Sequence, residues 1–362
     1  MKRILTGVVL LITAAGMAQD TTHQVNKGQV TFSGYAEAYY SYDLSKPKDN
    51  NRPGFIYSHN RSNEFNVNLA FIKANYTADR IRANVALGIG TYMNANYAAE
   101  PGVLKNIYEA NVGYKLSQTK NFWLDIGILP SHIGFESAVS KDCWTLTRSL
   151  LADNSPYYES GAKLTYTTNN NKWLFSALAL NGWQRIQRVA GNSLMSWGTQ
   201  VQYKPTDNVT VNYSTFLGTD KPDSVRRWRY FHNLYGQLQL TNQFGITLGF
   251  DIGQEQAKKG ESKLNTWYSP VVMLRFAPVD KWAFAVRGEY YSDEHGVIIP
   301  TGSPNGFKTG GCSANIDYLP ATNFALRLEG RLLNSKDDIF LSADQKPAGT
   351  NTAVTFSAAV SF

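Results

Sequence analysis

The sequence contains no run of about 20 consecutive apolar residues, which is the length that an α-helix needs to cross a bilayer, and its mean hydropathy is −0.32. Charged residues make up only 17% of the chain, and no run of lysine and arginine exceeds two residues. The chain therefore lacks the dense basic stripe of a nucleic-acid surface. Its two cysteines are too few for a disulfide framework. These absences exclude a helical membrane protein, a nucleic-acid-binding protein and a small disulfide-stabilised domain.

The beginning of the chain has the pattern of a signal peptide. Lys2 and Arg3 precede a short apolar core at 4–15, and Gly16-Met17-Ala18 is a small-x-small cleavage site. Because no cysteine follows that site, we expect no lipoprotein anchor. We expect an exported chain with three parts: a signal peptide at 1–18, a polar lead at 19–28 and one outer-membrane β-barrel at 29–362.

From residue 29 onward the chain repeats one pattern, a run of about 10–12 residues in which apolar and polar side chains alternate. This is the length of a tilted strand that crosses a membrane. Closed bacterial barrels use an even number of such strands. Sixteen runs are present, at 29–44, 63–77, 79–92, 106–117, 121–131, 159–168, 172–182, 193–204, 208–218, 229–240, 243–254, 264–276, 281–292, 308–318, 322–333 and 352–362.

The connections between these runs alternate between short and long. The short ones are rich in Asn, Asp and Pro, which favour turns, and lie at 77–79, 117–121, 169–171, 205–207, 241–242, 277–280 and 319–321. The long ones lie at 45–62, 93–105, 132–158, 183–192, 219–228, 255–263, 293–307 and 334–351. Short periplasmic turns and long external loops are typical of outer-membrane barrels, whereas a soluble β-sandwich has no reason to alternate so strictly.

Each run has an apolar face and a polar face, which alone fits either a soluble sheet or a membrane barrel. In the last run Val354, Phe356 and Val360 share one face, and Thr355 and Ser357 share the other. Aromatic residues gather near both ends of the runs, for example Tyr76, Trp123 and Trp282 near the short connections and Tyr92, Tyr230 and Trp267 near the long ones. Ordinary aromatic enrichment in strands is the alternative to two membrane belts, but the agreement with the signal peptide and the loop lengths favours a membrane. We therefore predict an all-β fold, a transmembrane antiparallel up-and-down β-barrel of about 16 strands.

The longest connection, 132–158, is the segment around which we expect the pore to be organised. A loop this long is usually functional or disordered, and its apolar residues, such as Phe135, Trp144 and Leu150, argue against disorder. We expect a helical element near 137–151, and none in the other connections. The segment joins the fifth and sixth runs, so we expect a constriction loop between strands 5 and 6 that folds into the barrel mouth. A loop that only caps the barrel is the alternative.

Several passages resemble one family. Phe362 ends an alternating run, which resembles the C-terminal signal that the barrel assembly machinery reads. The passages FSGYAEAYYSYDL, NVGYKLS…FWLDIGILPSHIGFES and GFESAVSKDCWTLTRSLLADNSPYYESGAKLTY resemble the OmpL-like β-barrel porin family of the Bacteroidetes (putative β-barrel porin-2). The resemblance covers essentially the whole mature chain and implies an outer-membrane porin, with no established catalytic or substrate-binding residues. Cys143 departs from the asparagine-like residue that follows Lys141-Asp142 in the family pattern. The segment 132–158 is the third long connection of the chain. In this it resembles the third loop of general sixteen-stranded porins, which folds into the barrel.

Charged side chains on the long segment and on the barrel wall are the candidate pore residues. On the segment they are Glu136, Lys141, Asp142, Arg148 and Asp153; on the wall they are Lys163, Arg287, Arg327 and Arg331, with Glu289, Glu329 and Asp251 beside some of them. Charges facing a narrow water-filled channel select ions. The excess of basic wall residues predicts a weak anion preference. The alternative is that the wall charges only pair with one another.

The expected function is passive diffusion of small hydrophilic solutes or ions through a porin. The alternative is a structural or assembly-partner barrel without an open pore, which the polar lumen face disfavours. No acid, base and nucleophile constellation suggests an enzyme, no metal spacing is present, and we expect no cofactor.

Cys143 and Cys312 should be free thiols, because alternation places Cys312 on the apolar outer face. Expected partners are outer-membrane lipid, the barrel assembly machinery, small hydrophilic solutes and, by analogy with other porins, further copies in a homotrimer.

Overall fold

The computed structural model describes residues 28–362. The expected signal peptide at 1–18 lies outside the described residues, as does all of the expected lead except Gly28.

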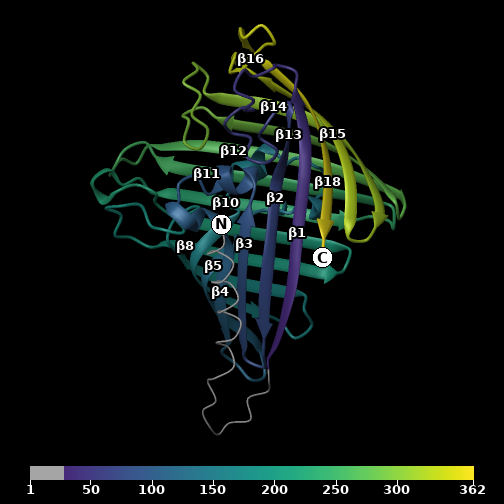
Figure 1. Ribbon diagram of the computed structural model, residues 1–362. Helices are drawn as coiled ribbons and strands as arrows, with labels where there is room; N and C mark the ends of the chain where they lie inside the picture. The colour runs from purple at the N-terminus through teal and green to yellow at the C-terminus, as the bar shows by residue number, and fades with distance from the viewer. Residues whose placement is uncertain (1–27) are drawn as a thin grey trace, which may run out of the picture.

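Sixteen strands close into one antiparallel barrel (Figure 1). They are β1 (Gln29–Asp43), β2 (Glu64–Thr77), β3 (Ile81–Ile89), β4 (Ile107–Lys115), β5 (Asn121–Pro130), β6 (Tyr158–Thr167), β7 (Trp173–Leu180), β8 (Ser196–Thr206), β9 (Val209–Gly218), β10 (Arg229–Gln239), β11 (Phe244–Gln256), β12 (Leu264–Val279), β13 (Trp282–Asp293), β14 (Phe307–Ala321), β15 (Phe324–Ser335) and β18 (Thr350–Ser361). The first and last strands pair with each other, from Tyr35 opposite Ser361 to Asp43 opposite Ala353. Every strand end lies within three residues of the end expected from the sequence, so the predicted barrel is confirmed.

The barrel is apolar outside and polar inside, the reverse of a soluble sheet protein. On β18, Val354 and Phe356 are 43% and 42% exposed, whereas Thr355 and Ser357 are 2% and 0% exposed. The exposed apolar band suits the hydrocarbon of a bilayer, and the polar residues face the lumen. This distribution explains why the alternating runs form membrane strands: each backbone polar group is paired within the closed sheet, so no edge is left unpaired in lipid.

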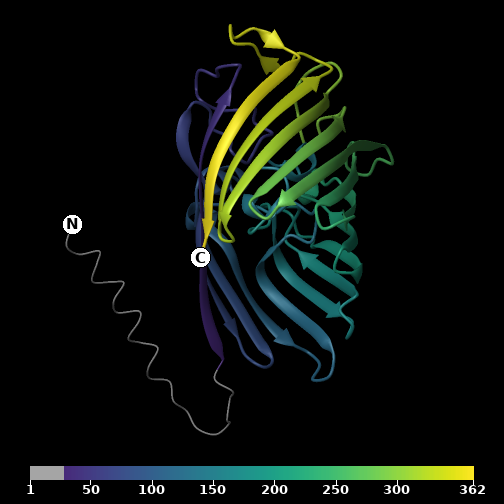
Figure 2. The ribbon, with the colours of Figure 1, turned by 90° about the vertical axis from the view of Figure 1, so that its right-hand side faces the viewer.

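Short turns join the strands at one end of the barrel and long loops join them at the other (Figure 2). The long loop after β15 carries a small hairpin of β16 (Phe340–Leu341) and β17 (Pro347–Ala348). Contrary to expectation, other long loops contain helical turns: α2 (Thr91–Asn96), η2 (Gly102–Asn106) and η4 (Asp223–Val225). Among residues 28–362, no helix has both the length and the apolar character to cross a membrane.

Some expected belt residues face inward instead. Trp282 is on the outer face and 42% exposed, but Trp267 is 1% exposed, in a cluster with Trp183 and Phe231. Trp123 faces the lumen, where the Arg82 guanidinium lies 4.2 Å from its ring centroid. Position near a strand end predicts a belt only when the alternation also directs the side chain outward. Both cysteines are free, as expected: Cys143 is buried and Cys312 is exposed.

The last residue completes the barrel seam. The Gly34 and Phe362 backbones exchange two hydrogen bonds, of 2.6 and 3.0 Å. A Cβ on Gly34 would lie 2.4 Å from the Phe362 ring, so the ring covers the glycine on the outer face.

We expect Phe362→Asp to lower the yield of folded barrel by more than half, because it places a carboxylate on the lipid-facing side of the seam. Heat-modifiable migration in gels measures the folded fraction. The matched control, Phe362→Tyr, keeps an aromatic ring and should fold normally. A normal folded fraction for Phe362→Asp would show that the seam does not need this ring.

Candidate functional site in the barrel lumen

Residues 131–157, here called the inner segment, connect β5 to β6 and lie inside the barrel. Ser140 Oγ lies 3.1 Å from the Tyr35 hydroxyl of β1. The Leu146 N–H donates to Asn315 Oδ1 of β14 at 3.1 Å. These partners face the lumen, and residues 145–156 are all buried. The inner segment therefore crosses the lumen and packs on the opposite wall.

The inner segment contains little regular structure. Its elements are the 3-10 turn η3 (Ser140–Asp142) and the short helix α3 (Leu150–Asp153). The expected helical element near 137–151 is therefore wrong in extent.

Side chains of the inner segment form hydrogen bonds with backbone groups that would pair with each other in a helix. Arg148 is fully buried and donates to Ser137 O at 2.6 Å and Leu146 O at 2.9 Å. Glu136 accepts from the Ser149 N–H at 3.2 Å and also from its hydroxyl. These local bonds satisfy buried backbone groups without a helical ladder. Two of the candidate pore residues, Arg148 and Glu136, thus hold the shape of the segment.

Arg327 of β15 binds the first half of the inner segment to the wall. It forms a bidentate pair with Asp317, at 2.6 and 3.0 Å. Its remaining donors reach the carbonyls of Ser140, Cys143 (2.9 Å) and Trp144 (3.3 Å). The planar guanidinium suits this task because its donors diverge from one rigid group.

Arg287 of β13 and Glu329 of β15 bind the middle of the segment. Arg287 donates to Thr145 Oγ1 at 2.9 Å and to Thr147 O at 2.7 Å. Glu329 accepts from the Thr147 N–H at 2.6 Å and from its hydroxyl at 2.7 Å. Arg287 and Glu329 also pair with each other at 2.9 Å. This ion pair strengthens the hydrogen bonds that each side chain forms with the inner segment.

Glu289 of β13 completes this group of contacts by accepting from the Leu150 N–H at 2.6 Å. Glu289 is also paired with Arg331 at 2.8 Å. We call the six wall residues the clamp: Arg287, Glu289, Asp317, Arg327, Glu329 and Arg331. Three are basic and three acidic, so the clamp has no net charge, and the three arginines are only 2–3% exposed. The clamp thus fits the alternative in which wall charges pair with one another.

The other charged candidates lie elsewhere. Lys141 Nζ donates to Thr322 O at 3.2 Å, in the short turn after β14. Asp142 is exposed. Asp251 is buried on β11 and accepts from Asn233 at 2.6 Å.

The start of the inner segment is fixed by a buried histidine. His132 Nδ1 lies 2.8 Å from Glu159 Oε1 of β6, and its Nε2 lies 2.9 Å from Thr215 O of β9. The Ser131 hydroxyl donates to Glu159 at 3.3 Å. Both ring nitrogens therefore have structural partners, and the arrangement serves to position the chain.

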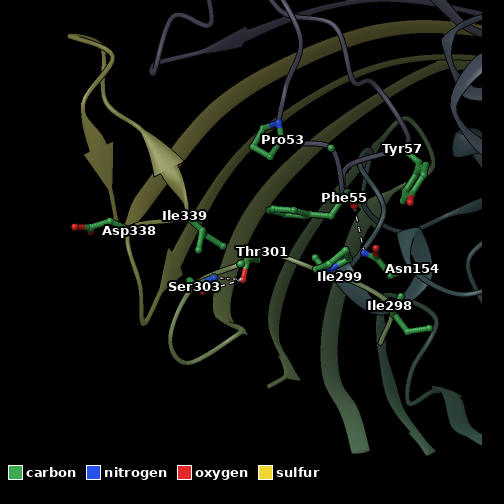
Figure 3. A pocket seen from close by; sticks show the side chains of 13 residues that line it. Pro53, Phe55, Tyr57, Asn154, Ile298, Ile299, Thr301, Ser303, Asp338 and Ile339 are labelled. Atoms are coloured by element: carbon green, nitrogen blue, oxygen red, sulfur yellow. Dashed lines mark hydrogen bonds between the residues drawn. The ribbon is translucent and has the colours of Figure 1, made fainter. Parts of the chain in front are cut away.

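An outer cavity of about 610 Å³ lies on the long-loop side of the inner segment (Figure 3). Its lining comes from three long loops and the inner segment, and includes Phe55, Tyr57, Asn154, Ile298, Ile299 and Ile339. Asn154 Nδ2 donates to Phe55 O at 3.2 Å, which joins the inner segment to the first long loop. A smaller cavity of about 230 Å³ also contacts Asp153, Asn154 and Ser155.

A further cavity of about 280 Å³ lies against Glu136, Pro156 and Tyr157, together with Tyr235 of β10. Residues 153–157, here called the thin limb, therefore lie between two cavities: residues 153–155 line one and residues 156–157 line the other. Two polar atoms of the thin limb, Asp153 Oδ1 and Tyr157 Oη, are buried without a hydrogen-bond partner among the described residues. Buried polar atoms of this kind are usually hydrated. Burial raises the pKa of the Asp153 carboxyl to about 7.

Lys163 of β6 lies apart from the clamp, in a wall cavity of about 540 Å³ toward the short-turn end. Sequence reasoning missed the other polar residues of this cavity, including Asn75, Asn111 and Asp125. Their strand alternation was available as a signal, because it places them on the lumen face. Their convergence depends on the register between strands, which the sequence does not state.

The comparisons with known proteins agree with this architecture. Residues 29–362 match the family described as "Putative beta-barrel porin-2, OmpL-like". A search of curated protein sequences finds no match to the chain.

Several solved structures share the fold. The anion-selective porin from Comamonas acidovorans has a TM-score of 0.60 at 10% identity, over 93% of this chain and 100% of that one. The outer membrane channel DcaP of Acinetobacter baumannii has a TM-score of 0.61 at 9% identity, over 96% and 100%. The trimer form of OmpT, an outer membrane protein of Vibrio cholerae, has a TM-score of 0.58 at 10% identity, over 92% and 98%. Given the family match across the whole barrel, the chain belongs to the OmpL-like putative β-barrel porin-2 family and is an outer-membrane porin.

Proposed function

We propose that this porin passes small hydrophilic solutes by diffusion, without catalysis, and that the inner segment narrows its pore. We further propose that the solute path crosses the inner segment at the thin limb, residues 153–157. The observation that carries this proposal is the pair of cavities at the two ends of the thin limb, each lined by a residue with an unpartnered polar atom.

The opposite side of the inner segment supports the same path. There the clamp binds the segment through charge-assisted hydrogen bonds, and Arg287 and Arg327 are each 2% exposed. Bonds of this type are short and strong, so they leave little space for water. A path beside the clamp would have to break them. A path at the thin limb would pass Asp153 Oδ1 and Tyr157 Oη, which have no hydrogen-bond partner among the described residues.

Recordings from the purified protein in planar lipid bilayers test the porin proposal. We expect stepwise increases in ionic current, each from the insertion of one porin, because polar side chains such as Thr355 and Asn111 line the lumen wall. Heat-denatured protein is the control. Insertion without any current step would contradict the proposal and favour a barrel without an open pore.

A cysteine at Tyr157 tests the path. We expect a charged methanethiosulfonate reagent to lower the current of Tyr157→Cys by more than half, because the attached group would occupy the thin limb. The matched control is Thr145→Cys, which lies in the same segment but is 0% exposed beside the clamp. The wild type controls for the native thiols. Equal responses of the two variants would place the path elsewhere.

We also propose a homotrimer embedded in outer-membrane lipid and inserted by the barrel assembly machinery. The support is the resemblance of the barrel to a porin solved as a trimer and the exposed apolar outer face. The mass of the protein extracted in mild detergent tests this assembly; a mass equal to one chain would contradict it.

A further inference from the structure

The wall cavity at the short-turn end is lined mostly by polar side chains. It lies against β2 to β7 and the beginning of the inner segment. Its lining includes Asn75, Asn84, Asn111, Trp123, Lys163 and Thr165. Its volume, about 540 Å³, is within the range of small-molecule sites.

One row of residues crosses four strands along this cavity. Arg82 of β3 is opposite Gly113 of β4, Gly113 is opposite Asp125 of β5, and Asp125 is opposite Lys163 of β6. Arg82 reaches over the glycine and forms a bidentate pair with Asp125, at 2.7 and 2.5 Å. A Cβ on Gly113 would lie 2.2 Å from Asp125 Oδ1, so only glycine permits this pair.

The bidentate pair leaves Lys163 without a carboxylate. Both oxygens of Asp125 are committed to Arg82, and Glu109, the other acid of the cavity, is paired with Lys73 at 2.5 Å. Within residues 28–362, Lys163 forms no ion pair. Lys73, Arg82 and Lys163 are three bases against the two acids Glu109 and Asp125, which leaves one positive charge, at the Lys163 ammonium. Glu159 of β6 is the further carboxylate that acts on Lys163, and it is held by the buried His132.

Neutral hydrogen-bonding groups surround this charge. Asn75, Asn84 and Asn111 lie opposite one another across β2, β3 and β4. Asn84 donates to Asn111 at 2.9 Å, while the Asn75 amide has no hydrogen-bond partner in the described part of the chain. Trp123 adds an aromatic surface to the same cavity. Amides can both donate to and accept from hydroxyl groups.

We propose that this cavity binds a small solute that carries one anionic group and several hydroxyl groups, such as a sugar carboxylate. Lys163 would pair with the anionic group, the asparagines with the hydroxyls, and Trp123 with an apolar face of the solute. A doubly charged solute is disfavoured, because one free ammonium compensates one charge and the carboxylates of Asp125 and Glu109 repel a second. This inference rests on the proposed function, since the solute must enter through the pore.

Glucuronate added to bilayer recordings tests the subsite, with glucose as the uncharged probe. We expect glucuronate to reduce the open-channel current in a saturable manner, and glucose to act only at higher concentration. Lys163→Gln should raise the half-saturating glucuronate concentration about tenfold, which corresponds to the loss of one charge-assisted hydrogen bond. The matched control is Lys204→Gln on β8, which removes an exposed lysine that does not line the cavity and should leave the value unchanged.

Titration calorimetry of glucuronate into the detergent-solubilised folded barrel separates this inference from the proposed function. Saturable binding that Lys163→Gln weakens and Lys204→Gln preserves supports the subsite, even if no current steps are seen. Equal effects of glucuronate and glucose, or equal losses in the two lysine variants, would overturn the subsite while leaving the porin intact. Heat-modifiable migration of each variant shows that the barrel is folded.

Discussion

The double variant Arg287→Ala, Arg327→Ala should conduct several-fold more current per channel than the wild type. Together these arginines hold the carbonyls of Ser140, Cys143 and Thr147 at the wall. Removing them leaves the buried carboxylates of Asp317 and Glu329 without their arginine partners, and breaking one buried pair in this way costs about 3–5 kcal/mol. The cost falls on the attachment of the inner segment, because the strands remain paired by their backbones. We therefore expect the segment to detach and the pore to widen.

Arg275 provides the matched control for the clamp variant. It lies on the neighbouring strand β12 and forms no ion pair within the described chain. Arg275→Ala should therefore change conductance little, although it also removes a positive charge. Deleting 137–149 gives the upper limit of conductance for a pore without this part of the segment. A folded clamp variant with the conductance of the wild type would show that other contacts hold the segment in place.

The same variant bears on ion selectivity. An anion preference based on Arg287, Arg327 and Arg331 assumes that their charges face the pore. In the structure these arginines are paired with three carboxylates and are nearly inaccessible. A neutral, buried group exerts little net field on passing ions. We therefore expect the clamp of the wild type to contribute little to ion selectivity. The variant keeps three carboxylates but only one arginine, so its reversal potential should shift toward cations.

The barrel could be predicted from the sequence because its signals are local. Alternation within each run sets which side chains face lipid, as for Val354 and Thr355, and turn residues set the lengths of the connections. The same local rule identifies Arg287, Arg327 and Glu329 as lumen residues. For Trp123 two signals conflict: its position near a strand end predicts an outer belt, whereas the alternation puts it on the same lumen face as Asp125.

The contacts inside the lumen could not be predicted, because they depend on register and on irregular backbone. Arg82 reaches Asp125 only across Gly113, and that convergence requires two strand registers at once, one of which shifts between Ala86 and Leu87. Arg287 and Arg327 bind carbonyls of the inner segment, and a carbonyl has no sequence signature. The helix expected near 137–151 failed for a related reason, since Arg148 takes the carbonyls that a helix would require.

The second large effect is a change of ion selectivity with pH. It should come from Asp153, the titratable acid of the thin limb. Asp153 is 3% exposed and lies in a connecting segment, not in a strand. Burial raises the pKa of its carboxyl to about 7, although the nearby guanidinium groups of Arg331 and Arg148 lower it. The other groups that act on it are Glu136 of the inner segment, Arg52, Tyr57 and Ser58 of the first long loop, Tyr157 of the thin limb and Arg287 of β13.

The direction in which pH changes the ion selectivity follows from the protonation of the Asp153 carboxyl. Below its pKa, Asp153 is neutral, and above it the thin limb gains a negative charge while the arginines stay charged. The ratio of cation to anion permeability should therefore rise between about pH 6 and about pH 8 in the wild type. The same shift affects stability: the folded state retains a proton that the unfolded chain releases above about pH 4, so the contribution of Asp153 to the free energy of unfolding falls as pH rises toward 7.

Asp153→Asn should remove most of this pH dependence and hold the permeability ratio at its low-pH value. Reversal potentials in a salt gradient, measured at several pH values, give the ratio directly. Glu136→Gln is the matched control, because burial also raises the pKa of the Glu136 carboxyl and its side chain lines the cavity beside Tyr157. If Glu136→Gln loses the pH dependence and Asp153→Asn keeps it, Glu136 is the titrating group. If both variants keep it, ions do not pass the thin limb, because a charge that appears in the narrowest part of a water-filled channel must alter which ions pass.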